Sequence, residues 1–165
     1  MDIIFSIIRV DTFWKILLFI RFALAVALLA AVTLQAVAVL MPARQVAGNF
    51  VDRSPVPAVS LTTLIIVLYV LQALMGAWIY VKYRIYVRIP MEQLRHWWTL
   101  GSFEEKEHVV AMGLFLLPAY WYFWRQPLAA DAGIRKAVTV FLAFCVWYAF
   151  IVGHVANDFR GVGAL

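Results

Sequence analysis

Four runs of apolar residues, separated by shorter polar segments, lie at residues 16–40, 60–81, 103–124 and 137–156. Each is close to the 20 or so residues that an α-helix needs to cross the hydrocarbon core of a bilayer. No segment shows the alternation of apolar and polar residues over about ten positions that is typical of a membrane β-strand. Because backbone groups in lipid must bond internally, the pattern predicts four transmembrane helices.

The polar segments between the runs predict how these helices are connected. Residues 42–57 and 126–136 are short and contain proline and glycine, which end helices. Short connections place consecutive helices side by side and in opposite directions. The sequence therefore predicts an all-α integral membrane protein with a single membrane domain over residues 1–165. Its four transmembrane helices are expected to form an antiparallel bundle.

Two further segments are amphipathic and are predicted to lie along the membrane surface. Between the second and third runs, Met91, Leu94 and Trp98 fall on one helical face beside basic residues and a second tryptophan. At the N-terminus, residues 2–14 show the same pattern, with four isoleucines on one face.

The composition indicates that lipid is the solvent for much of the chain. Of the 165 residues, 65% are hydrophobic and 14% are charged, whereas a soluble domain has about 45–50% and 25%. The net charge is +5, and nine of the 14 lysine and arginine residues fall on one side of the predicted membrane. This asymmetry places both termini in the cytoplasm. The basic residues do not alternate with stacking aromatics on a polar background, so we expect no nucleic-acid partner.

The third run begins with charged residues, in the stretch SFEEKEHVV at 102–110. Ser102 and Glu105 have the spacing of a capping box, in which each side chain bonds an amide at the other's end of the first turn. This predicts that the helix begins near Phe103. Acidic residues in a first turn also complement the helix dipole.

Two histidines are predicted to lie at a similar depth in the membrane. The third run starts on the cytoplasmic side and the fourth ends there, so His108 and His154 each lie within about one turn of that boundary. Glu104 and Asp158 lie four residues from His108 and His154, which gives each imidazole a carboxylate on its own helical face. Two imidazoles from adjacent helices at matching depth predict one b-type haem with His108 and His154 as its iron ligands.

Arg21 falls in the same layer and is expected to neutralise an acidic group such as a haem propionate. The candidate cofactor-binding residues are therefore His108, His154, Glu104, Asp158 and Arg21. A simpler explanation is open for most of them: glutamates favour a helix start, histidines are tolerated at an interface, and arginine extends to the headgroups.

Three functions fit this pattern. The sequence predicts a small multi-pass subunit of a larger membrane complex, with one haem between the third and fourth helices for electron transfer. A structural or accessory subunit without a cofactor explains the same features, and Ala23, Ala27 and Ala31 have the spacing of close helix contacts. A metal- or proton-conducting protein is the third possibility, although such proteins usually carry polar groups at mid-membrane or broken helices. The chain shows no signature of an enzyme acting alone.

Overall fold

The computed structural model of the chain describes residues 10–40, 45–46, 49–50, 58–95, 97–126 and 131–162. The side chains of residues 155–162 and of a few other helical positions lie outside the description. The predicted amphipathic segment at residues 2–14 therefore lies largely outside the described residues.

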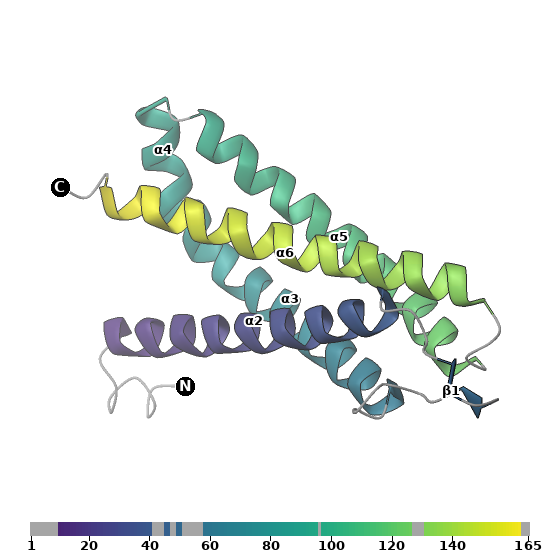
Figure 1. The fold of residues 1–165 in the computed structure, drawn as a ribbon. Helices are drawn as coiled ribbons and strands as arrows, with labels where there is room; N and C mark the ends of the chain where they lie inside the picture. Colours follow the sequence, from purple (N-terminus) through teal and green to yellow (C-terminus); the bar gives the residue numbers. More distant parts are fainter. Residues whose placement is uncertain are drawn as a thin grey trace.

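The described chain is helical except for two strands of two residues each. The elements in chain order are α2 (Val10–Leu40), β1 (Gln45–Val46), β2 (Asn49–Phe50), α3 (Ala58–Tyr83), the π-helix η1 (Arg84–Arg88), α4 (Ile89–Gln93), α5 (Trp97–Arg125) and α6 (Ala132–Val162) (Figure 1). β1 and β2 pair antiparallel, with Gln45 opposite Phe50 and Val46 opposite Asn49. The two ends of the molecule are called the β1 end and the α4 end below.

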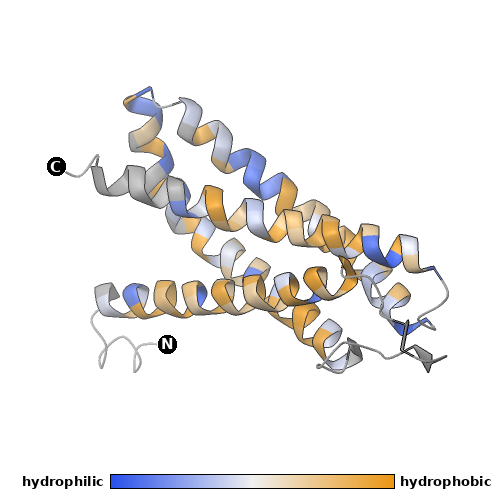
Figure 2. Ribbon diagram, viewed as in Figure 1, coloured by the Kyte–Doolittle hydropathy of each residue, from blue (hydrophilic) through white to orange (hydrophobic). Residues whose placement is uncertain are grey.

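Three helices are long and apolar enough to cross a membrane, over Thr12–Leu40, Ser60–Val81 and Ala132–His154. This confirms a helical fold with several membrane-length helices. α5 is as long, with 29 residues, but the half nearer the α4 end contains a hydrophilic stretch, drawn blue in Figure 2. Its charged first half is what separates α5 from the other three helices.

α5 begins earlier than the sequence predicts. Its first residue is Trp97, so Ser102 lies inside the helix, and the predicted capping box with Glu105 is wrong. The Ser102 hydroxyl instead donates to the backbone carbonyl of Trp98, at 2.8 Å, which is the local bond that serine forms inside helices. The chain turns before α5 at Arg95, whose φ of 58° is in the left-handed region. That turn divides the predicted surface segment at 91–100 between α4 and α5.

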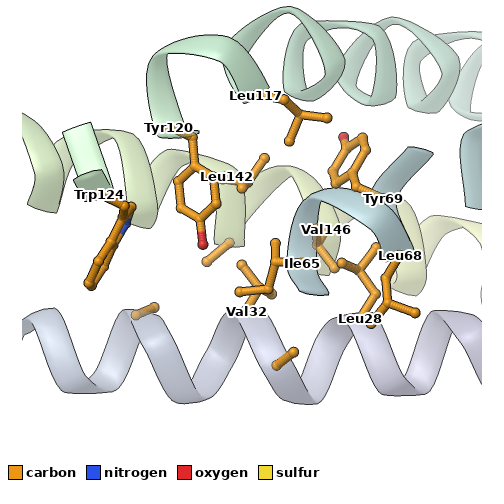
Figure 3. Close-up of a cluster of buried hydrophobic side chains, with 13 residues drawn as sticks. Leu28, Val32, Ile65, Leu68, Tyr69, Leu117, Tyr120, Trp124, Leu142 and Val146 are labelled. Atoms are coloured by element: carbon orange, nitrogen blue, oxygen red, sulfur yellow. The ribbon is translucent and has the colours of Figure 1, made fainter. Parts of the chain in front are cut away.

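A single apolar core lies where the four long helices meet. α5 packs against α6 and α3, and α2 packs against α6 and α3, so each long helix contacts two others. Figure 3 shows the buried cluster, with Leu28 and Val32 from α2, Ile65 and Leu68 from α3, and Leu142 from α6. α2 and α3 cross at this cluster and diverge from it toward the α4 end (Figure 1).

The approach of α3 to α5 depends on a glycine. The Tyr69 hydroxyl donates to the backbone carbonyl of Val110 on α5, at 3.1 Å. A Cβ atom at Gly113 would overlap that same hydroxyl. Gly113 is therefore the residue that lets the two backbones come this close.

Candidate functional site

One face of α5 points into the bundle along its whole length. Its residues recur every three or four positions, the spacing of one helical face, and all are buried or half-buried: Phe103, Lys106, Val110, Gly113, Leu117, Tyr120 and Trp124. Six of them are apolar, aromatic or glycine. The exception is Lys106, which is only 5% exposed. A charged side chain thus occupies a core position near the α4 end.

Toward the β1 end the core contains neutral polar side chains that bond one another. Gln35 on α2 donates from Nε2 to the Thr62 hydroxyl on α3, at 2.9 Å. The Tyr120 hydroxyl on α5 donates to Gln35 Oε1. All three side chains are buried, and a buried polar group without a partner is costly. These bonds therefore tie α2, α3 and α5 together at one level.

A second set of polar contacts joins α5 to α6 at the β1 end. Trp124 donates from Nε1 to the Thr139 hydroxyl at 2.9 Å. The Arg135 guanidinium, 5% exposed, donates from Nε to the Phe123 carbonyl at 2.9 Å and from Nη2 to the Gln126 carbonyl at 3.3 Å. The last carbonyls of a helix have no partner within it and carry partial negative charge. Arg135 thus neutralises and bonds the C-terminal end of α5.

The α4 end contains charged groups in place of neutral ones. Lys106 lies with its Nζ 3.1 Å from Glu107 Oε1 and 3.7 Å from the centre of the Phe103 ring. Arg21 on α2 is influenced by the charge of Glu107 and in turn acts on Lys106. Its Nη2 lies 3.4 Å from the position that a Cβ would occupy at Gly76 on α3. α2 and α5 therefore contribute two cations and one carboxylate to one cluster, which lies against Gly76 of α3.

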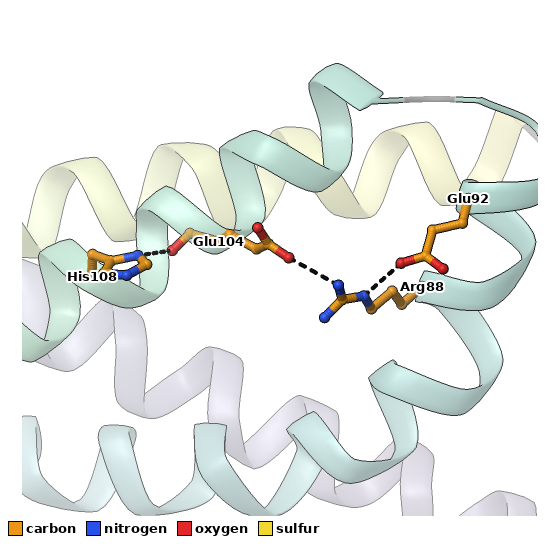
Figure 4. Close-up of polar contacts among 4 residues, drawn as sticks. All are labelled: Arg88, Glu92, Glu104 and His108. Atoms are coloured by element: carbon orange, nitrogen blue, oxygen red, sulfur yellow. Dashed lines mark hydrogen bonds and ion pairs between the residues drawn. The ribbon is translucent and has the colours of Figure 1, made fainter.

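The structure gives Glu104 a different partner from the one that the sequence predicts. Its carboxylate lies 3.2 Å from Arg88 Nη2, and Arg88 Nε donates to Glu92 at 2.8 Å (Figure 4). The hydrogen bond to Glu92 raises the pKa of the Arg88 guanidinium above its ordinary value. The expected bond from the Glu104 carboxylate to His108 is therefore wrong, because that carboxylate joins α5 to η1.

His108 is exposed, and its ring is held by its own helix. Nδ1 lies 2.7 Å from the backbone carbonyl of Glu104 (Figure 4). Since a carbonyl only accepts, Nδ1 carries a proton in this contact, and in the neutral imidazole Nε2 then has the lone pair. That is the tautomer of an imidazole able to bind a metal through Nε2.

His154 is also exposed and lies on the α2 side of α6. Its ring stacks on Phe150 at 5.8 Å and on Phe22 of α2 at 6.2 Å between centroids. The side chain of Asp158, its expected partner, lies outside the described residues. The described contacts bring Arg21, Lys106 and Glu107 together but do not join His154 to His108.

The register of α5 against α6 separates the two histidines along the bundle. Tyr148 on α6 interacts with Glu105 on α5. From that level His108 is three residues toward the β1 end and His154 six residues toward the α4 end. At a rise of 1.5 Å per residue the two backbone positions are on the order of 10 Å apart. Among the described residues no group of three or more histidine, cysteine, aspartate or glutamate side chains could hold a metal ion.

Reasoning from the sequence missed Lys106 and Arg135 as buried cations. The signal for Lys106 was present, because it lies three residues after Phe103 and four before Val110 on the inward face of α5. Arg135 carried no such signal, since its burial depends on how the turn after α5 places α6. Comparisons of the chain with protein-family models, with curated proteins and with solved structures found no match.

Proposed function

We propose that the protein is a small multi-pass subunit of a larger membrane complex, in which α2, α3, α5 and α6 all cross the bilayer as an antiparallel bundle with both termini in the cytoplasm. α5 is supported as the fourth span by its length and by its packing against both α3 and α6. In its hydrophilic first half, Lys106 is buried in the bundle and Glu104 forms an ion pair with Arg88 of η1. These contacts reduce the cost of carrying charges at the membrane boundary.

The observation that carries the subunit role is the outer face of α2. Ala23 and Ala27 are exposed at the four-residue spacing of a close helix–helix contact, and Ala30 is exposed beside them. Ala31, the third residue of the predicted spacing, is instead buried in the bundle. Beside them α2 and α6 form an apolar concavity lined by Val26, Leu29, Ala30, Thr33, Leu34 and Trp147. Only 17% of the residues in the apolar stretch of α2 are buried in the bundle. The occupant that fits a small-residue face beside a concavity is a transmembrane helix of another protein.

Co-purification tests this proposal. The tagged chain, extracted from its native membrane in mild detergent, is expected to bring one or more membrane proteins with it. Ala27→Leu is expected to remove them, because a bulky side chain keeps a second backbone from the close approach. Ala77→Leu, at an exposed alanine of α3, is the matched control and should keep them. A wild-type chain that is a stable monomer with no partner would contradict the proposal.

A b-type haem is the second candidate, and the tautomer of His108 favours it. With Nδ1–H held by the Glu104 carbonyl, Nε2 of the neutral ring has the lone pair that an iron ligand needs. Binding one iron between His108 and His154 would require the two rings to approach each other across the offset between α5 and α6. Arg21 would then be the cation available to a propionate.

Absorption spectra test the haem directly. A Soret band and a reduced α-band are expected in the purified protein, and both His108→Ala and His154→Ala should abolish them. His96→Ala is the control and should leave them unchanged. A fully loaded preparation without either band would remove the haem and leave the subunit role in place.

A further inference from the structure

Arg21 occupies an unusual place for a cation. It lies in the apolar stretch of α2, nine residues beyond Thr12, and its guanidinium lies against Gly76 of α3. Within the described residues it has no hydrogen bond and no ion pair. A guanidinium carries five N–H donors, and a membrane interior offers no water to satisfy them.

The charges around Arg21 do not balance. Glu107 is the carboxylate that acts on Arg21, and it also pairs with Lys106 at 3.1 Å. Two cations therefore share one anion among the described residues of this cluster. Lys106 is held in place over the Phe103 ring, so the excess positive charge is a fixed property of the fold. A desolvated excess charge is costly unless an opposite charge binds to it.

An unpaired acceptor lies on the same face of α3. Gln72 Oε1 is buried and has no hydrogen-bond partner among the described residues. Gln72 lies one turn before Gly76 and three residues after Tyr69, which packs on α5. Unsatisfied donors of Arg21 and an unsatisfied acceptor of Gln72 therefore occur within one turn of each other along α3. Of the two, the Arg21 guanidinium carries the charge, and an anionic group is the ligand that would satisfy it.

We propose that Arg21, with the charge of Lys106 behind it, binds the phosphate group of an anionic phospholipid, such as phosphatidylglycerol. Exposed side chains close to Arg21 and Gly76 in the sequence, Leu18 on α2 and Trp78 on α3, are apolar and suit acyl chains. Inorganic phosphate shares the chemistry of the headgroup and is the alternative source of the anion. The inference does not depend on a partner complex or on a haem.

Lipid titration by native mass spectrometry tests the site with the full chain. The wild-type protein in a neutral detergent is expected to bind phosphatidylglycerol at least about tenfold more tightly than phosphatidylcholine. Both lipids offer a phosphate to Arg21, but the choline cation of phosphatidylcholine offsets the attraction between that phosphate and the positive cluster. Arg21→Gln should remove this preference. Lys15→Gln, which changes an exposed cation six residues earlier on α2, should keep it.

Two further measurements make each outcome decisive. Competition by millimolar inorganic phosphate would support recognition of the phosphate group itself. If phosphate competes but phosphatidylglycerol binds no more tightly than phosphatidylcholine, the ligand is the free anion and not the lipid. Arg21→Lys keeps the charge and replaces the planar fork with a point charge, so an intermediate preference supports the site should Arg21→Gln fail to fold. A wild-type protein that binds neither phosphatidylglycerol preferentially nor phosphate overturns the proposal, and so does an Arg21→Gln protein that keeps the wild-type preference.

Discussion

The two ends of the bundle solve the same physical problem in different ways. At the β1 end the buried polar groups match: Gln35 bonds both Thr62 and Tyr120, and Arg135 bonds the last carbonyls of α5. At the α4 end Lys106 and Arg21 share Glu107, and the Gln72 oxygen has no partner among the described residues. Matched polar groups fix how helices pack, whereas unmatched ones leave binding capacity for something else. The difference assigns structure to one end and recognition to the other.

The largest expected effect comes from changing the same residue type at both ends. Gln35→Leu should lower the free energy of unfolding by about 2–3 kcal/mol, because the Thr62 and Tyr120 hydroxyls each lose a buried partner. Gln72→Leu should be neutral or stabilising, since it removes an acceptor that has no described partner. Unfolding in mixed detergent micelles measures both. Equal losses for the two variants would show that the ends do not differ.

Arg135→Met should cost about 2 kcal/mol, because the carbonyls of Phe123 and Gln126 lose charge-assisted donors at the end of α5. Lys136→Met is the matched control, since Lys136 is the next residue of α6 and is exposed. The same unfolding measurement applies. If the two variants are equally stable, Arg135 does not hold α5 to α6.

Lys106→Met should raise stability by up to about 1 kcal/mol, because it removes a desolvated charge and leaves Arg21 matched by Glu107. Glu107→Gln should have the opposite sign, since Lys106 and Arg21 then remain without their carboxylate. The pair of thermal unfolding curves tests whether the cluster is unbalanced. A destabilised Lys106→Met protein would indicate that the lysine is matched by a group beyond this cluster.

The smallest effect concerns Tyr83, which stacks on Phe103 at 3.9 Å between centroids. Burial raises the pKa of its hydroxyl to about 12, above the value near 10 in an unfolded chain. Its contribution to stability is therefore complete below pH 10 and is lost as the pH rises toward 12. Thermal unfolding between pH 9 and 12 should show a loss that is smaller in Tyr83→Phe. The same loss in both proteins would mean that Tyr83 does not contribute.

Sequence patterns predicted the helices well because membrane-length apolar runs have few alternative structures. The start of α5 could not be placed, since a capping box at Ser102 and Glu105 and a turn at Arg95 are both compatible with local preferences. The partner of Glu104 could not be predicted either, because Arg88 comes from η1 and reaches it only through the tertiary fold. The inward position of Lys106 was predictable from helical periodicity, but its sharing of Glu107 with Arg21 required the placement of α2.

The π-helical segment η1 has a consequence for how insertions and deletions act on this protein. A π-helical turn accommodates about one more residue than an α-helical turn, so the helix that begins as α3 continues into α4 with its side chains rotated by roughly 100°. Arg88, the last residue of η1, is the residue that pairs with Glu104. Losing a single residue from Arg84–Arg88 would leave a continuous α-helix of nearly the same length. Different side chains of its last two turns would then face α5. In this part of the chain the number of residues in η1 is therefore expected to affect which charged side chains of the helix face those of α5.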